Sequence, residues 1–263
     1  MIDKSTVDTF RTHFFENGYI IIPQHPSTNE VAEVREDVHS VLAESFGVEG
    51  KQVPVNTDEA YLELKASNPP LKGRAYDVMG SLQCVRDAFA KPSLRAIARA
   101  ILDSPAVLDH TQVRIDDNAN DRLLPMHQEM NQMSLRNTTV WIPLQDVKSQ
   151  DEGGLRIIPG SHKKGFLPHR IYNEPHAYHG VREDQFDAAD ELRLEMNAGD
   201  ALMFHPLLIH GSVPNQSSNI RWTIVGRLNG LKTLRYLEAD ERYYPLDRED
   251  PIYEAYNKEF SWV

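Results

Sequence analysis

Hydrophobic positions in the first hundred residues recur at helical spacing. Over residues 29–46, apolar side chains fall on one face of a helix and acidic side chains fall mostly on the other. The apolar face consists of Val31, Val34, Val38, Val41 and Leu42. The same pattern predicts a first helix capped by Ser5-Thr6 and ended by Asn17-Gly18, and another helix over 93–102.

Two other segments of this half do not follow helical spacing. Residues 19–22 form a β-rich run that closes at Pro23. The stretch 47–73 contains three prolines and predicts a long loop with a short helix. Loops of that length in a compact domain often face the substrate.

Beyond residue 105 the pattern changes to short β-rich runs separated by turn residues. The runs lie at 107–115, 138–144, 155–158, 192–196, 201–204 and 222–228. Their spacing predicts an all-β sandwich or barrel rather than alternating β-α units. We therefore expect a single domain over 1–263, with a helical part (1–105), a β core (106–230) and a C-terminal tail (231–263) that wraps the surface.

Composition and charge narrow the possible partners. The chain has 263 residues, of which 40% are hydrophobic and 25% charged, as in ordinary globular proteins. Its 28 basic and 39 acidic residues give a net charge of −11, which argues against nucleic acid and anionic membrane surfaces as partners. The first residues lack a secretory signal and no stretch is apolar enough to span a membrane, so we expect a cytoplasmic protein.

The cysteine and histidine contents indicate which metal sites are possible. A single cysteine, Cys84, cannot form an internal disulfide or a thiolate metal cluster. His, Asp and Glu are therefore the available ligands for any metal. Of the 11 histidines, seven fall between His127 and His210, and a purely structural role does not predict that concentration.

The segment His127-Gln128-Glu129 carries an imidazole and a carboxylate two residues apart. On an extended chain both side chains project from the same face, so both can reach one ion. About eighty residues later His210 ends a predicted strand, and Arg221 follows after eleven more. Two histidines and one carboxylate form the facial triad of non-haem Fe(II) oxygenases. A nearby arginine can hold the far carboxylate of a bidentate acid ligand.

The order and spacing of these segments resemble the phytanoyl-CoA dioxygenase-like (PhyH) family of Fe(II)/2-oxoglutarate-dependent oxygenases. The matching pieces are the run 16–22, His127-Gln128-Glu129, the run 141–144, the run 153–165 with its Pro-Gly-Ser-His signature, and the run 199–221. The resemblance implies a mainly β fold with flanking helices, namely a double-stranded β-helix, which is a cupin-like jelly roll. This fold agrees with the order of helices and strands predicted from the patterning.

The resemblance also implies roles for individual residues. It implies that His127, Glu129 and His210 bind Fe(II). The residues implied to contact 2-oxoglutarate are Arg221, Gln112 and Trp141. We therefore expect a dioxygenase that uses Fe(II), O2 and 2-oxoglutarate as cosubstrate. Such an enzyme hydroxylates or otherwise oxidises a small molecule and releases succinate and CO2.

One position departs from the family pattern. Most hydroxylating members carry Asp where this chain has Glu129, which is one methylene longer. Related halogenases have Ala or Gly there, so the carboxylate favours oxygenation over halogenation. Two alternatives stay open. One is a non-catalytic protein that binds 2-oxoglutarate or metal. The other is a β-helix enzyme that uses another divalent ion for isomerisation or hydrolysis.

Polar residues near the predicted site favour a small polar or natural-product-like substrate over a fatty acyl thioester. The candidates for contact with it are Asn131, Gln132, Arg114, Tyr76 and Arg74. The acidic net charge gives no help in attracting polyanionic coenzyme A. The sequence carries no signal for an oligomeric state.

The remaining histidines between His127 and His210 have structural explanations. Strand alternation puts His205 on the face opposite His210, which predicts a structural role. His162 is expected to stabilise the turn of the Pro-Gly-Ser-His signature. The other three, His169, His176 and His179, are expected on a solvated surface loop.

Overall fold

Six α-helices cover most of the N-terminal part of the computed structural model, which describes residues 2–118, 124–129, 137–148, 151–172 and 178–231. The helices are α1 (Lys4–Asn17), α2 (Thr28–Val48), α3 (Thr57–Ser67), α4 (Pro69–Gly80), α5 (Gln83–Phe89) and α6 (Pro92–Leu102). Three 3-10 turns follow later, η2 (Ser161–Lys164), η3 (Glu183–Gln185) and η4 (Ala188–Asp190). Within the described ranges, no helix combines the length and apolar character that a membrane span requires.

The first helix begins earlier than the sequence pattern predicted. The Asp3 carboxylate accepts hydrogen bonds from the backbone N–H of Thr6 at 2.9 Å and from the Thr6 hydroxyl at 2.7 Å. Asp3 is therefore the N-cap, and Ser5 and Thr6 lie in the first turn instead of capping it. The helix ends at Asn17, and the C-cap Gly18 has a φ of 82°, a left-handed conformation that suits glycine.

The expectation of a long loop over 47–73 was wrong, because α3 and α4 occupy most of that segment. The Asn56 side chain caps α3 by accepting from two backbone N–H groups, and the Asn68 side chain caps α4 in the same way with one. The prolines Pro69 and Pro70 begin α4 rather than interrupt a helix, because proline fits the first turn, where its missing N–H is not needed. The prolines and the capping asparagines of these two helices were thus mistaken for the composition of a loop.

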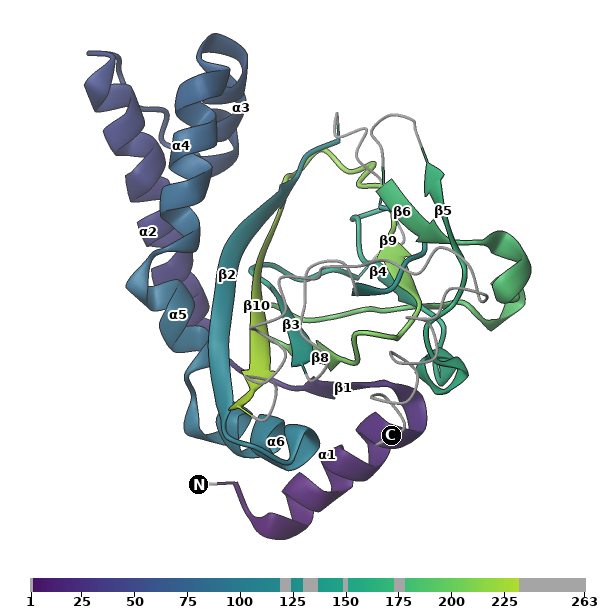
Figure 1. Ribbon diagram of the computed structural model, residues 1–263. Helices are drawn as coiled ribbons and strands as arrows, with labels where there is room; N and C mark the ends of the chain where they lie inside the picture. The colour runs from purple at the N-terminus through teal and green to yellow at the C-terminus, as the bar shows by residue number, and fades with distance from the viewer. Residues whose placement is uncertain (1, 119–123, 130–136, 149–150, 173–177, 232–263) are drawn as a thin grey trace.

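The strands form three antiparallel sheets. They are β1 (Tyr19–Ile22), β2 (Ala106–Asp116), β3 (Asn137–Pro143), β4 (Leu155–Ile157), β5 (His169–Tyr172), β6 (Tyr178–Val181), β7 (Leu192–Arg193), β8 (Ala201–Phe204), β9 (His210–Ser212) and β10 (Arg221–Gly230). The large sheet has the order β1-β8-β3-β10-β2, the small sheet has the order β7-β4-β9, and β5 pairs with β6. The large and small sheets face each other and confirm the predicted double-stranded β-helix (Figure 1).

Three strands were not predicted. His210 was expected to end a strand, but it begins β9, which has only three residues, too few for a periodic pattern. Strands β5 and β6 form a hairpin in the segment that we expected to be a solvated loop. Strand β1, by contrast, confirms the β-rich run predicted over 19–22, and it pairs with β8 and so extends the large sheet. Residues 232–263 of the expected tail lie outside the described residues, and the single domain stays a prediction.

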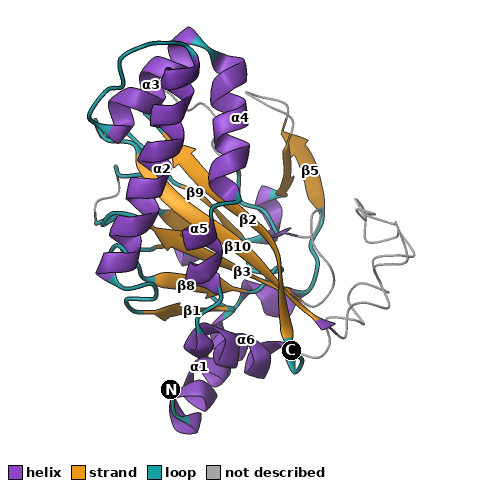
Figure 2. Ribbon diagram, turned by 90° about the vertical axis from the view of Figure 1, so that its left-hand side faces the viewer, coloured by secondary structure: helices purple, strands orange, loops and turns teal. Residues whose placement is uncertain are grey.

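Helices cover the outer face of the large sheet. Figure 2 shows α2 to α5 in front of this face, and α4 and α5 contact β2 while α6 contacts β10 and β3. A large apolar cluster fills the space between these helices and the sheet. A second cluster, which includes Trp141, Leu155, Phe204 and Val225, fills part of the space between the two sheets. The interior of the β-helix is therefore backed by a rigid, helix-covered wall.

Candidate metal centre

Two distant histidines face each other through backbone pairing. The N–H of His127 donates to the carbonyl of His210 at 2.8 Å, and the N–H of His210 donates to that of His127 at 3.1 Å. This pair of bonds places the two residues directly opposite each other as an antiparallel bridge. Their ring centroids lie 4.2 Å apart. The N–H of Glu129 donates to the carbonyl of Pro206 at 2.8 Å, so a second backbone bond ties Glu129 to the chain that precedes His210.

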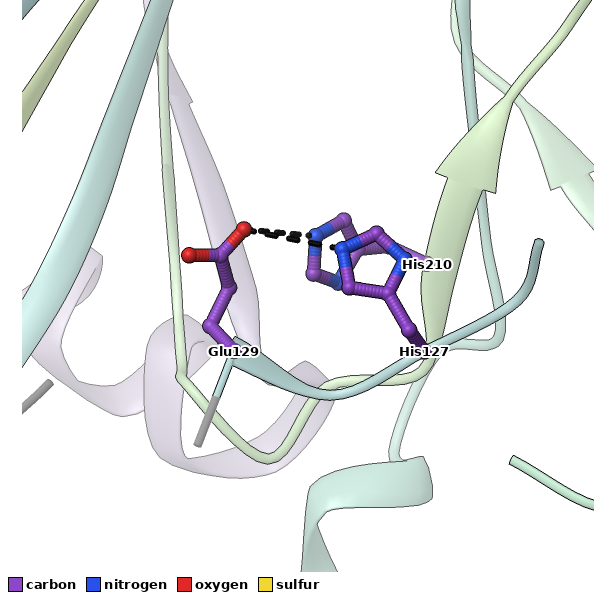
Figure 3. A group of neighbouring side chains, drawn as sticks. All are labelled: His127, Glu129 and His210. Atoms are coloured by element: carbon purple, nitrogen blue, oxygen red, sulfur yellow. Dashed lines mark ion pairs between the residues drawn. The ribbon is translucent and has the colours of Figure 1, made fainter. Parts of the chain in front are cut away.

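Each of these two rings is oriented by a backbone carbonyl. Nδ1 of His127 lies 2.8 Å from the carbonyl of Pro125, and Nδ1 of His210 lies 2.9 Å from that of Leu208. A carbonyl can only accept, so each Nδ1 carries the proton and each Nε2 is left as the metal-facing nitrogen. Figure 3 shows both Nε2 atoms pointing at the Glu129 carboxylate.

The three side chains have the geometry and chemistry of a cation site. Glu129 Oε1 lies 3.6 Å from His127 Nε2 and 3.4 Å from His210 Nε2. The three ligand atoms lie within 4.8 Å of one another, as one divalent ion requires. Burial lowers the pKa of His127, and the neighbouring His210 lowers it further, so its Nε2 lone pair faces a carboxylate oxygen at neutral pH. Lone pairs that converge in this way repel one another unless a cation lies between them.

The Glu129 carboxyl is ionised in this setting. Burial works to raise the pKa of the Glu129 carboxyl, but its neighbours, which include the Arg227 guanidinium, hold this pKa well below its ordinary value. A carboxylate at this position is the anionic oxygen ligand that a hard or borderline divalent ion such as Fe(II) accepts.

Gln128 fixes the segment between the two ligands. Its side chain is 1% exposed and points away from the site, as alternation along an extended chain requires. Its Nε2 donates to the carbonyls of Gly165 at 3.0 Å and Leu207 at 2.7 Å, and its Oε1 accepts from the N–H of Leu167 at 3.0 Å. Local sequence does not predict this role, because Gln128 contacts backbone groups that are far away in the chain.

A cavity beside the three ligands lies between the two sheets. Its polar lining residues are Gln112, Arg114, Thr139, Ser212, Arg221 and Arg227. Its apolar lining residues are Leu124, Trp141, Leu155, Phe204 and Val225. The register of the large sheet explains most of this set. Val225 of β10 lies between Gln112 of β2 and Trp141 of β3, so these three form one row across the sheet.

Arg221 lies at the start of β10 and is 3% exposed. It pairs with Asp116, which lies directly opposite it on β2, through its Nη2. Its Nε and Nη1 are buried and have no hydrogen-bond partner among the described residues. The guanidinium carbon lies 5.4 Å from the centre of the Trp141 ring. A buried guanidinium with two unused donors in a cavity is suited to binding an anion.

The other residues nominated from sequence fall into three groups. Gln112, Trp141 and Arg114 line the cavity with the three ligands. Tyr76 and Arg74 lie on α4, which packs on the outside of β2, and neither is among the residues that line the cavity. The proposed substrate contacts Asn131 and Gln132 lie outside the described residues.

Two of the remaining histidines are internal, and a third lies where we did not expect it. His205 is fully buried, and His162 donates through Nε2 to the carbonyl of Phe15 at 3.1 Å. The surface position expected for His169 was wrong, because it is 4% exposed and stacks on Phe166 at 4.7 Å. His179 is half-buried on β6, and His176 lies outside the described residues.

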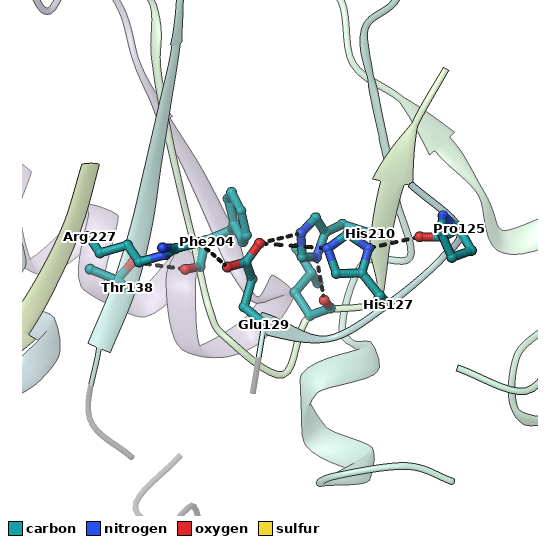
Figure 4. A network of polar contacts seen from close by, with 8 residues as sticks. Pro125, His127, Glu129, Thr138, Phe204, His210 and Arg227 are labelled. Carbon is teal, nitrogen blue, oxygen red and sulfur yellow. Dashed lines mark hydrogen bonds and ion pairs between the residues drawn. The ribbon is translucent and has the colours of Figure 1, made fainter. Parts of the chain in front are cut away.

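Arg227 is a site residue that the sequence analysis missed. It lies on β10 and lines the cavity, and its Nη2 lies 3.3 Å from Glu129 Oε2 (Figure 4). Its spacing from Arg221 is the available signal. Arg221, Val225 and Arg227 are separated by even numbers of residues, so their side chains share one face of the strand.

A sequence profile described as phytanoyl-CoA dioxygenase (PhyH) matches residues 14–223. Among curated proteins, the chain is similar to a probable phytanoyl-CoA dioxygenase of Caenorhabditis elegans, with 28% identity over 173 residues that cover 61% of this chain and 51% of that protein. It is also similar to a 1-deoxypentalenic acid 11-beta-hydroxylase of Streptomyces arenae, with 27% identity over 231 residues that cover 82% of this chain and 76% of that protein. The chain thus spans about half the length of the nematode relative.

Solved structures support the same grouping at the level of the fold. The chain is similar to the epimerase SnoN in complex with Fe3+, alpha ketoglutarate and nogalamycin RO, with a TM-score of 0.59 and 17% identity, over 87% of this chain and 85% of that one. The profile match spans most of the chain, including the two histidines, the carboxylate and Arg221. This chain belongs to the phytanoyl-CoA dioxygenase family.

Proposed function

We propose that this protein is an Fe(II)- and 2-oxoglutarate-dependent dioxygenase that oxidises a small molecule. The observation that carries the proposal is the convergence of His127 Nε2, His210 Nε2 and Glu129 Oε1 beside a cavity that Arg221 also lines. Family membership and the iron and alpha ketoglutarate of the similar SnoN structure support it. Iron, when bound, supplies the oxidative chemistry, and the chain supplies the geometry.

His127, Glu129 and His210 would hold the ion together, and the adjacent cavity would give further ligands access to it. His127 and His210 bind through Nε2, because their Nδ1 protons are held by backbone carbonyls. Glu129 binds through Oε1, and its charge offsets part of that of the ion. The backbone pairing between the two histidine segments fixes this geometry before any metal arrives.

Arg221 holds the distal carboxylate of 2-oxoglutarate through its unused Nε and Nη1 donors. Asp116 orients the guanidinium from the opposite side, and Trp141 forms the wall over which the guanidinium carbon lies. Gln112 lies in the same row of the sheet as Trp141 and lines the cavity, where its amide can hydrogen-bond to the cosubstrate. The apolar side chains Leu155 and Phe204 line the cavity and limit access of water to the site.

The primary substrate in this proposal is a small polar or natural-product-like compound. The polar lining of the cavity, with Arg114 among its members, supports this class. The Streptomyces arenae relative is named for hydroxylation of 1-deoxypentalenic acid, which also supports it. The product is hydroxylated or otherwise oxidised, and succinate and CO2 are released. We also propose a cytoplasmic location, since the single cysteine suits a reducing compartment.

Succinate formation tests the proposal. Purified protein is incubated with Fe(II), 2-oxoglutarate and O2, with and without a panel of small molecules, and succinate is measured. We expect succinate only when all three components are present, with loss of the activity in His210→Ala. The exposed His13 on α1 serves as the control, and His13→Ala should turn over like the unmodified protein.

Two outcomes would contradict the proposal. Protein that contains iron and yields no succinate with any compound would be a non-catalytic binding protein. Substrate turnover that does not depend on O2 or 2-oxoglutarate would instead indicate a metal-dependent isomerase or hydrolase on the same fold.

A further inference from the structure

The two oxygens of the Glu129 carboxylate have different neighbours. Oε1 faces the two histidines, at 3.6 Å from His127 Nε2 and 3.4 Å from His210 Nε2. Oε2 faces the opposite way and accepts a hydrogen bond from Arg227 Nη2 at 3.3 Å (Figure 4). One oxygen is thus directed at the metal position, and the other is held by a strand of the large sheet.

Arg227 is held in the direction of Glu129 by its place in the sheet. It lies opposite Thr139 of β3 on one side and His110 of β2 on the other. The register between β10 and β2 shifts directly after it, between Arg227 and Leu228. Irregularities of this kind re-aim side chains and are frequent beside active sites. The Arg227 and Glu129 side chains are each 14% exposed, so their contact is largely shielded from water.

A glutamate ligand needs such a partner more than an aspartate does. The extra methylene adds a rotatable bond, so the carboxylate can rotate away from the histidines or turn both oxygens toward the ion. Hydrogen bonds to a ligating carboxylate restrict these alternatives and fix the direction of the coordinating oxygen. The planar guanidinium of arginine provides that restraint with a defined direction, whereas lysine provides a point charge.

We propose that Arg227 is a positioning residue that holds Glu129 as a ligand through a single oxygen, and that it thereby compensates for the longer side chain at this position. The proposal rests on the proposed function in that it takes the three ligands to bind a divalent ion. It assigns Arg227 no contact with the metal, with 2-oxoglutarate or with the substrate. Its effect passes through Oε2 of Glu129.

A simple charge effect predicts the opposite result. A guanidinium near a metal site repels the incoming cation, so its removal should tighten metal binding if charge alone mattered. Loss of a positioning hydrogen bond should weaken metal binding, by roughly 10- to 100-fold for partners of metal ligands. The sign of the change in metal affinity therefore separates the two explanations.

Binding of Co(II) alone, under anaerobic conditions, tests the proposal without relying on turnover. The dissociation constant and the visible spectrum of bound Co(II) are measured for the unmodified protein, Arg227→Gln and Arg227→Lys. We expect roughly 10- to 100-fold weaker binding and an altered spectrum for Arg227→Gln. We expect a smaller loss for Arg227→Lys, which keeps the charge and a donor.

Arg156 provides a matched control. It lies on β4, and its Nη1 lies 3.2 Å from Glu191 Oε2, a distance close to that in the Arg227–Glu129 pair. Arg156→Gln should bind Co(II) like the unmodified protein. Circular dichroism and thermal unfolding check the fold of each variant. If Arg227→Gln does not fold, Arg227→Lys reports on the same hydrogen bond.

A second measurement tests whether Arg227 acts through Glu129. In a Glu129→Asp background the shorter carboxylate cannot reach both the metal position and Arg227. Arg227→Gln should then weaken Co(II) binding less than it does in the unmodified chain. An equal loss in both backgrounds would overturn the proposal.

Other results would also overturn it. One is unchanged or tighter Co(II) binding in Arg227→Gln. Another is an unchanged Co(II) affinity with a raised KM for the primary substrate, which would make Arg227 a substrate contact. Failure of the unmodified protein to bind Co(II) or Fe(II) at all would instead refute the proposed function, so the two failures are distinct.

Discussion

Replacing Arg221 with lysine tests whether this guanidinium holds the cosubstrate. Arg221 is 3% exposed and pairs with Asp116, while its Nε and Nη1 have no hydrogen-bond partner among the described residues. Burial lowers the pKa of Arg221, and the Asp116 carboxylate opposes that change, so the side chain stays charged at neutral pH. In our account the two unused donors bind the distal carboxylate of 2-oxoglutarate.

Lysine is the informative substitution because it keeps a positive charge opposite Asp116. Methionine would remove the positive charge beside this carboxylate, which is 13% exposed. Such a loss costs about 3–5 kcal/mol of folding free energy and would confuse lost binding with lost structure. Lysine lacks the fork of the guanidinium and gives up at least one hydrogen bond to 2-oxoglutarate. A hydrogen bond to a charged group contributes about 1.5–3 kcal/mol, which corresponds to roughly 10- to 150-fold weaker binding.

The assay is an anaerobic titration of 2-oxoglutarate into Fe(II)-loaded protein, with the dissociation constant as the readout. Arg156→Lys is the control, since Arg156 pairs with Glu191 at 3.2 Å and is not among the residues that line the cavity. A dissociation constant for Arg221→Lys within twofold of the unmodified protein would refute the reasoning. So would an Arg114→Lys variant that loses affinity while Arg221→Lys does not.

Two further predictions concern stability. A Cβ at Gly226 would lie 2.7 Å from the Phe89 ring. Gly226→Ala should therefore lower the free energy of unfolding, measured by urea denaturation, by about 1–3 kcal/mol, and by less in a Phe89→Leu background. An equal loss in both backgrounds would contradict this prediction. Burial lowers the pKa of both His162 and His169 to about 4, whereas the unfolded chain takes up these protons near the ordinary histidine pKa. The contribution of the two histidines to the free energy of unfolding is therefore complete above about pH 6.5 and is lost as the pH falls toward 4, on the order of 3 kcal/mol for each residue. A melting temperature that does not change between pH 7 and 5 would argue against this prediction.

The sequence predicted the parts of the fold that have a regular period. The apolar stripe of α2 and the β-rich runs of β3 and β10 are visible in the patterning, since α2 buries one face over many residues and the two strands are buried on almost their whole length. Helices α3 and α4 were missed, because their Asn caps and the paired prolines have the composition of a loop. Strand β9 was missed because three residues carry no period.

The residues of the candidate site also differ in whether local sequence predicts them. His127, Glu129 and His210 were selected as candidate ligands from their spacing together with the resemblance to the family. The roles of Arg227 and Gln128 depend on which strands lie beside them and on distant backbone carbonyls. The Asp116 partner of Arg221 likewise follows from the register between β2 and β10. Register is fixed by the packing of the whole sheet, so local pattern does not predict such contacts.

The most direct test of the account is the visible absorption of the protein with Fe(II) and 2-oxoglutarate in the absence of O2. We expect a charge-transfer band when both are added to the unmodified protein, because 2-oxoglutarate would then chelate an iron held by His127, Glu129 and His210. The band should be absent in His127→Ala and His210→Ala and present in His13→Ala. An unmodified protein that binds iron but shows no band, or a band that persists in His210→Ala, would contradict the account.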